Sequence, residues 1–193
     1  MKKIYLVLTY TGTWLAKIIR QYTKKEYSHI SISLDENLQR MYSFGRHHPY
    51  IFFWGGFVHE SVHYGTFKRF SKTKAAIYEM QVTEEQYERM AEEINAFKKQ
   101  KMLYHFNILG LFGVAFHKRR IKKNYYYCAE FIRHLFEKAG VLQEPMPEVI
   151  KPEDFQKLPG LHQVYEGNLK VYQGRKDEER SIKRKKRKDN GTV

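Results

Sequence analysis

The stretch "EYSHISISL", residues 26–34, has the pattern of a β-strand with two chemically different faces. Side chains alternate along a strand, so Ile30 and Ile32 share one face while His29, Ser31 and Ser33 share the other. A solvated sheet edge would explain a lone histidine between serines. That is the more common case, and the alternative is a general base that faces a nucleophile from elsewhere in the chain.

A second informative stretch is "YYYCAEFIRHLFEKAG", residues 125–140, which predicts a helix. Its apolar residues recur at helical spacing, and Gly140 is placed to end it. Cys128 falls in the first turn, where the helix dipole and free N–H groups favour a thiolate. The alternative is that Cys128 is a small buried hydrophobic residue.

The remaining pattern predicts an α+β fold, an antiparallel sheet packed with helices. Expected helices cover 11–24 and 83–100, the second with Thr83 as its N-cap and lysines at its end. Thr11 or Thr13 is available to cap the first. Further strands are expected at 3–10, 38–44, 55–62 and 75–82, with a hairpin at 162–172 that turns at "EGN".

Length and charge predict a single domain over residues 1–173, followed by a disordered basic tail at 174–193. The formal net charge of +14 favours non-specific contact with an anionic polymer or a membrane surface. The basic runs at 117–124 ("HKRRIKKN") and 183–188 ("KRKKRK") fit such contacts. The run at 183–188 has no interleaved aromatic residues, so no specific nucleic-acid recognition is predicted.

Neither the N-terminal segment nor the longest apolar region predicts secretion or a membrane span. The N-terminal apolar run covers only Ile4–Leu8 and no small-residue cleavage site follows it. The apolar region 102–116 contains His105 and Asn107 and is shorter than the roughly 20 residues that span a bilayer. The expected compartment is therefore the cytoplasm.

Together, "YSHISISL" and "YYCAEFIRHLFEKAG" resemble the circularly permuted papain-like amidases of the NlpC-type clan. In that permuted branch the histidine strand precedes the cysteine helix, which is the order seen here. The resemblance covers the first 45 residues and roughly 120–140. It implies a permuted papain-like fold with Cys128 as nucleophile and His29 as the base that takes its proton.

Members of this family orient the imidazole with a polar third residue on the next strand, commonly a glutamate. The matching position falls within "MYSFG", residues 41–45, and gives Ser43. A serine can accept the imidazole N–H, but it brings no charge to stabilise an imidazolium. Glu60 and His47 are the alternatives for this role.

The resemblance implies a cysteine hydrolase that cleaves an amide bond, in a peptide or a peptidoglycan-derived substrate, and needs neither metal nor organic cofactor. One alternative is a lipid acyltransferase or lipid hydrolase on the same fold, for which the apolar region 102–116 would suit an acyl substrate. Another is a catalytically decayed basic binding module, which a serine in the third position would favour.

Residues 59–63, "HESVH", match the zinc-peptidase pattern H-E-x-x-H. That pattern binds zinc on a helix, where histidines four apart share a face. The surrounding glycines and β-branched residues favour a strand, on which these histidines would lie about 13 Å apart. The sequence therefore indicates an accidental match and no metal site.

Overall fold

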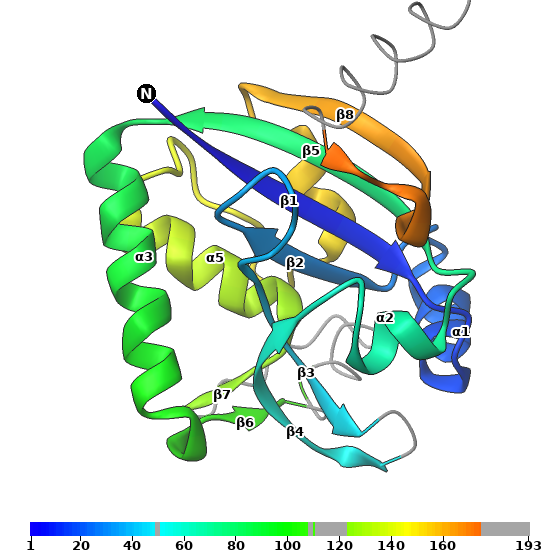
Figure 1. Cartoon of the computed structure of the whole chain (residues 1–193). Helices are drawn as coiled ribbons and strands as arrows, with labels where there is room; N and C mark the ends of the chain where they lie inside the picture. Colours follow the sequence, from blue (N-terminus) through cyan, green and yellow to red (C-terminus); the bar gives the residue numbers. More distant parts are fainter. Residues whose placement is uncertain (49–50, 108–109, 111–122, 175–193) are drawn as a thin grey trace, which may run out of the picture.

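The computed structural model describes residues 1–48, 51–107, 110 and 123–174. Its helices and strands follow one another in the order shown by the labels of Figure 1. They are β1 (Lys2–Tyr10), α1 (Trp14–Thr23), β2 (His29–Ser33), β3 (Met41–His48), β4 (Ile51–Glu60), α2 (Gly65–Arg69), β5 (Lys74–Val82), α3 (Glu84–Lys99), η1 (Lys101–Leu103), β6 (His105–Phe106), β7 (Tyr125–Tyr126), α5 (Cys128–Ala139), η2 (Pro152–Lys157), β8 (Leu161–Asn168) and η3 (Leu169–Val171).

Six strands form one antiparallel sheet in the order β4-β3-β2-β1-β5-β8. β1 lies inside the sheet, between β2 and β5, and its residues Ile4–Leu8 are buried on both faces. Because both faces of β1 are buried, its odd-numbered and even-numbered residues are both apolar. The short strands β6 and β7 pair separately and in parallel. The predicted α+β class and antiparallel sheet are confirmed.

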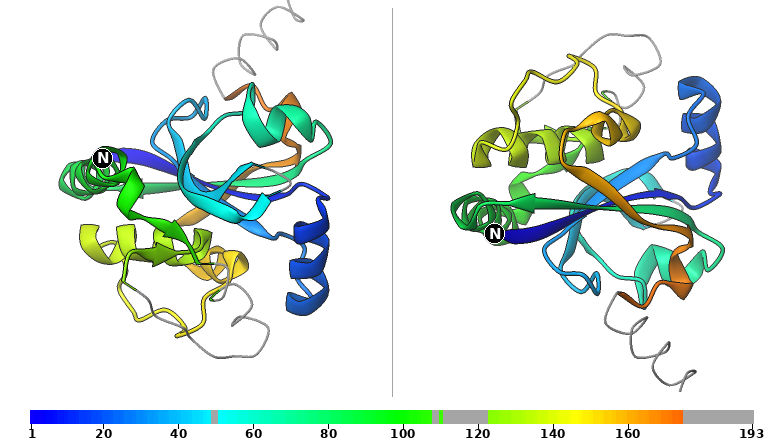
Figure 2. Two further views of the ribbon diagram at one scale, coloured as in Figure 1. Left: turned by 90° about the horizontal axis from the view of Figure 1, so that it is seen from below. Right: turned by 90° about the horizontal axis from the view of Figure 1, so that it is seen from above.

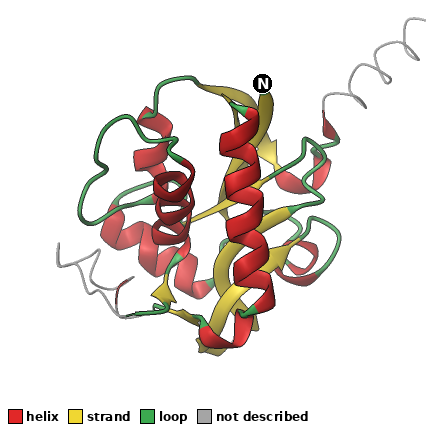
Figure 3. Cartoon of the chain, turned by 90° about the vertical axis from the view of Figure 1, so that its left-hand side faces the viewer, coloured by secondary structure: helices red, strands yellow, loops and turns green. Residues whose placement is uncertain are grey.

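Helices cover both faces of the sheet, as the edge-on views in Figure 2 show. The larger core lies between one face and helices α3 and α5, which pack beside each other (Figure 3). A smaller core on the other face contains Phe67 of α2 and Leu169 of η3. Since α5 and α2 lie on opposite faces, a site where strands end can draw residues from both layers.

The helices begin and end as their sequences predict. Thr13 caps α1 by accepting a hydrogen bond from the Ala16 N–H, and Thr83 forms a capping box with Gln86 at the start of α3. Gly140 ends α5 with a φ of 68°, a conformation that glycine adopts without strain. Cys128 is the first residue of α5.

One expectation is wrong, and one helix was not predicted. Residues 162–172 do not form a hairpin; β8 is a single strand that pairs with β5, and the 3-10 turn η3 follows it. The stretch after β4 contains the short helix α2, which no periodic pattern indicated. Five residues are too few to show the spacing by which a helix is recognised in sequence.

Several expectations fall on residues outside the described ranges. These are most of the apolar region 102–116, most of the basic run 117–124 and the tail from residue 175. The division of the chain at residue 173 therefore stays a prediction. Within the described ranges, none of the helices has both the length and the apolar character needed to cross a bilayer.

Candidate functional site

The polar face of β2 is buried. Ser31 and Ser33 have no exposed surface, and Ile30 and Ile32 on the opposite face enter the larger core. His29 is the first residue of the strand, paired with Thr9 of β1, and its side chain is 20% exposed. The solvated-edge interpretation therefore does not describe this strand.

A carboxylate from the end of β4 meets the imidazole. His29 Nε2 lies 3.0 Å from Glu60 Oε1 and 3.2 Å from Oε2, and the Glu60 side chain is 14% exposed. The Ser31 hydroxyl donates to Glu60 Oε2 in a very short hydrogen bond. Glu60 is thus held from two sides, and its charge is directed at the ring.

This environment changes the protonation of His29. Burial lowers the pKa of the imidazole, but the Glu60 charge and hydrogen bonds with Cys128 and Glu60 outweigh burial and raise the pKa to about 10. Because Nε2 faces Glu60, Nδ1 is the ring nitrogen left for the Cys128 sulfur. At neutral pH the imidazole is therefore protonated, and it lies between the Glu60 carboxylate and the Cys128 sulfur.

The start of α5 is fixed by a buried carboxylate. Glu130 accepts hydrogen bonds of 3.2 Å from the Tyr127 N–H and from Asn107 Nδ2. The Asn107 N–H in turn donates to the Tyr126 carbonyl, 2.8 Å away. This network ties the first turn of the helix to the segment after β6, so Cys128, which is 4% exposed, has a defined position.

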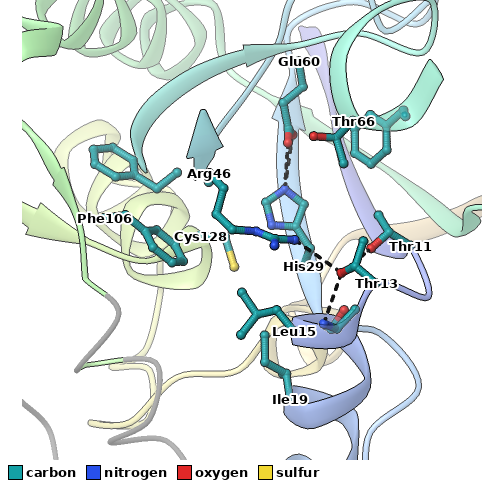
Figure 4. Close-up of a pocket in the computed structure, with 15 residues that line it drawn as sticks. Thr11, Thr13, Leu15, Ile19, His29, Arg46, Glu60, Thr66, Phe106 and Cys128 are labelled. Atoms are coloured by element: carbon teal, nitrogen blue, oxygen red, sulfur yellow. Dashed lines mark hydrogen bonds and ion pairs between the residues drawn. The ribbon is translucent and has the colours of Figure 1, made fainter. Parts of the chain in front are cut away.

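Cys128, His29 and Glu60 line one pocket of about 80 Å³, shown in Figure 4. Arg46 of β3 also lines the pocket, and its Nη2 donates to Thr13 Oγ1 at 3.3 Å. The rest of the wall includes apolar side chains from α1 and β6, namely Leu15, Ala16, Ile19 and Phe106. The volume suits a small reacting group rather than a whole substrate.

The structure brings together three of the five residues named as candidates. Cys128, His29 and Glu60 meet, whereas the buried Ser43 hydroxyl donates to the Ile30 carbonyl at 2.7 Å. His47 is exposed, and its ring packs against Trp54, with 5.5 Å between the ring centroids. Glu60, rather than Ser43 or His47, is the partner of the imidazole. Ser43, the third-position serine that favoured a decayed module, bonds to the Ile30 carbonyl, and a carboxylate meets the imidazole instead.

Sequence reasoning assigned no role to Ser31, Arg46 or Glu130. The sequence could have indicated Ser31, because this residue shares the polar face of its strand with His29. It could also have indicated Glu130, because an acidic residue in a first helical turn is a common N-terminal signature. Nothing in the sequence around Arg46 indicated that it would reach a pocket.

The residues of the "HESVH" motif diverge in the structure. The His59 ring contacts the Gln39 carbonyl through Nε2 at 2.8 Å and the Tyr64 hydroxyl through Nδ1 at 3.0 Å, while Glu60 faces His29. Neighbouring residues of a strand point to opposite faces, which explains the separation. In the part of the chain that the structure describes, no three His, Cys, Asp or Glu side chains cluster as metal ligands would.

No protein-family model matches the chain, and no curated protein or solved structure is significantly similar to it. Functional inference therefore depends on the geometry of the pocket. A thiol at a helix start, beside an imidazole that a carboxylate charges and orients, can act as a nucleophile with its own proton carrier.

Proposed function

We propose that this protein is a cysteine hydrolase of the permuted papain-like type, with Cys128 as nucleophile, His29 as acid and base, and Glu60 as the residue that orients the imidazole. One observation carries the proposal: a pocket wall shared by the three side chains, with His29 Nε2 3.0 Å from Glu60. The preferred substrate bond is an amide in a peptide, including one derived from peptidoglycan.

In the first half-reaction, the Cys128 thiolate attacks the amide carbonyl and forms a C–S bond. The backbone N–H of Cys128, at the start of α5, is one donor to the oxyanion. The His29 imidazolium gives its proton to the leaving nitrogen as the C–N bond breaks. An amine departs and a thioester stays on Cys128.

In the second half-reaction, neutral His29 takes a proton from water, and the resulting hydroxide attacks the thioester. The C–S bond breaks, a carboxylic acid leaves, and the thiolate–imidazolium pair is restored. Glu60 stabilises the imidazolium in both resting state and product, and Ser31 holds the carboxylate in place.

A second candidate is acyl transfer or lipid hydrolysis through the same thioester. The apolar wall formed by Leu15, Ile19 and Phe106 favours it, because an acyl chain would contact these side chains next to the nucleophile. The two candidates differ in the bond that is attacked and in whether water or another alcohol or amine captures the acyl group.

The first test is the pH dependence of Cys128 alkylation by iodoacetamide, followed by intact mass. Cys128 is the only cysteine of the chain, so each adduct reports this thiol, and Cys128→Ser is the blank. We expect fast alkylation at pH 6, where an ordinary thiol of pKa about 8.5 is nearly unreactive. If the alkylation rate depended on pH as it does for an ordinary thiol, the result would contradict the proposal.

The second test separates the two candidates. Intact mass after incubation with a peptide amide or with a short-chain lipid ester shows which acyl group forms a thioester on Cys128. We expect the peptide acyl group. An adduct from the lipid ester alone would favour the acyl-transfer candidate.

A further inference from the structure

A larger groove adjoins the catalytic pocket. It has a volume of about 1050 Å³ and shares Arg46, Glu60, Thr66 and Phe67 with the pocket wall. Since the pocket itself holds only a small reacting group, the adjoining groove is the place for the rest of a substrate. We call it the β4 groove.

The β4 groove follows the outer edge of a strand. Trp54, Gly55 and every residue from 57 to 61 line it, so side chains of both parities contribute. Residues of α2 flank it from one face of the sheet, and Lys98, at the end of α3, flanks it from the other. In the described part of the chain, β4 pairs with β3 and with no second strand, and the segment of Tyr104 and Phe106 packs against Gly55 and Gly56.

The groove is strongly positive. Four permanently charged side chains line it, namely Arg46, Arg69, Lys98 and Lys101. Four histidines join them, namely His47, His48, His59 and His105. Among the described residues of this lining, Glu60 is the one that carries a carboxylate, and His29 balances its charge.

We propose that the β4 groove binds an acidic, extended segment of the peptide substrate, an inference that rests on the proposed hydrolase function. Its backbone pairs with β4 on the side that faces the groove, between the strand and the segment of Tyr104 and His105, and its carboxylates face Arg46, Lys98 and Lys101. From Trp54 to Glu60 the strand measures about 20 Å, which accommodates a segment of about six residues. Trp54, 56% exposed, offers a surface for an apolar side chain.

A peptide fits this surface better than a nucleic acid or an anionic membrane surface does. Addition of a strand to a sheet edge uses backbone N–H and C=O groups, which peptides have and lipids and nucleic acids lack. The basic residues also lie along a concave groove, whereas a membrane surface is contacted by a protruding face. Charge complementarity then selects acidic over neutral segments.

Binding to the full-length Cys128→Ser protein tests the inference without any chemistry. The probes are fluorescein-labelled hexapeptides, one rich in Asp and Glu and one with Asn and Gln at the same positions, measured by fluorescence anisotropy. We expect the acidic peptide to bind at least about tenfold more tightly, with a preference that shrinks as salt is raised.

The chain offers a matched control with the same change of charge. Lys98→Glu with Lys101→Glu reverses two charges in the groove, whereas Lys99→Glu with Lys138→Glu makes the same change at exposed lysines outside it. We expect the first pair to weaken acidic-peptide binding about tenfold and the second to leave it nearly unchanged. Melting curves of both variants check the fold.

Three outcomes would overturn the inference: no preference for the acidic peptide, equal losses in both double variants, or a groove variant that loses binding to phosphatidylglycerol vesicles or poly-uridine RNA but keeps the peptide. The proposed hydrolase function would survive each of them, because fast alkylation of Cys128 at pH 6 is measured without a peptide. Conversely, if Cys128 were alkylated slowly at pH 6 while the acidic peptide still bound, the result would contradict the proposed hydrolase function. It would support the β4 groove as a binding site.

Discussion

Two histidine–glutamate pairs in the described part of the chain have nearly equal geometry. His29 Nε2 lies 3.0 Å from Glu60, and His134 Nε2 lies 2.8 Å from Glu93. The histidine side chains are 20% and 22% exposed, so burial does not distinguish them either. One pair joins two strands, and the other joins α5 to α3.

The pairs differ in what else surrounds each ring. His29 lines a pocket with Cys128, whereas the His134 ring packs against Phe97 and Tyr126, with centroids 5.6 Å and 5.5 Å away. Both histidines therefore have a carboxylate at one ring nitrogen, but of the two only His29 also has a nucleophile beside it. The comparison indicates that a histidine–glutamate pair becomes a candidate catalytic unit through its third partner.

Removing each imidazole gives the largest expected contrast. His29→Ala should lower the rate of Cys128 alkylation at pH 6 by about 10²-fold or more, because the thiolate loses its counter-ion. His134→Ala should leave that rate unchanged and lower the melting temperature. Iodoacetamide kinetics and a thermal melt measure both. Equal losses of reactivity would remove the distinction between the pairs.

Removing each carboxylate charge should have a smaller effect with a characteristic pH dependence. Glu60 and Cys128 raise the pKa of His29 from its ordinary 6.5 to about 10, so protonated His29 stabilises the fold fully below pH 6.5 and progressively less as the pH rises toward 10. In Glu60→Gln the loss of stability should therefore be largest near pH 6 and shrink toward pH 10. Alkylation at pH 6 should fall about tenfold.

Glu93→Gln is the matched control for this experiment. It should not change the pH dependence of alkylation, because Glu93 contacts His134 and not the pocket. Urea unfolding at several pH values, together with alkylation rates, gives both readouts. A stability difference for Glu60→Gln that grows with pH would contradict the assignment of the charge on His29.

The smallest contrast lies between two buried serines. Ser31→Ala removes a hydrogen-bond donor to Glu60. Because one hydrogen bond contributes about 1 kcal/mol, the loss of this support for Glu60 should slow alkylation of Cys128 a few-fold. Ser43→Ala removes a donor to the Ile30 carbonyl and should cost about 1 kcal/mol of stability without slowing alkylation. If Ser43→Ala slowed alkylation more than Ser31→Ala did, Ser43 would again be a candidate for the residue that orients the imidazole.

Hydrophobic patterning was sufficient to predict most of the architecture. The apolar stripe of α5, the capping residues of α3 and the alternation in β2 are local signals, and the structure confirms the elements they indicate. Helix α2 and the single strand β8 were missed, because a five-residue helix lacks periodicity and a glycine-containing segment resembles a turn.

The third member of the candidate site was harder to predict, since it depends on sheet register. Ser43 and Glu60 lie on neighbouring strands, with Met41 opposite Glu60 and Val58 opposite Ser43. Both side chains face the same layer, and the difference in their length bears on which one meets His29. The long glutamate reaches the ring, whereas the short serine bonds to the nearest carbonyl.

The order of the elements along the chain also bears on how the protein is synthesised. β2 and β4, which provide His29 and Glu60, leave the ribosome well before α5, which begins with Cys128. The nascent chain therefore has its acid–base partners in place before it has any thiol to activate. A nascent chain that ends before residue 128 lacks the proposed nucleophile and could form no acyl adduct. When α5 follows, it meets strands β1 to β5, and β8 completes the sheet only afterwards.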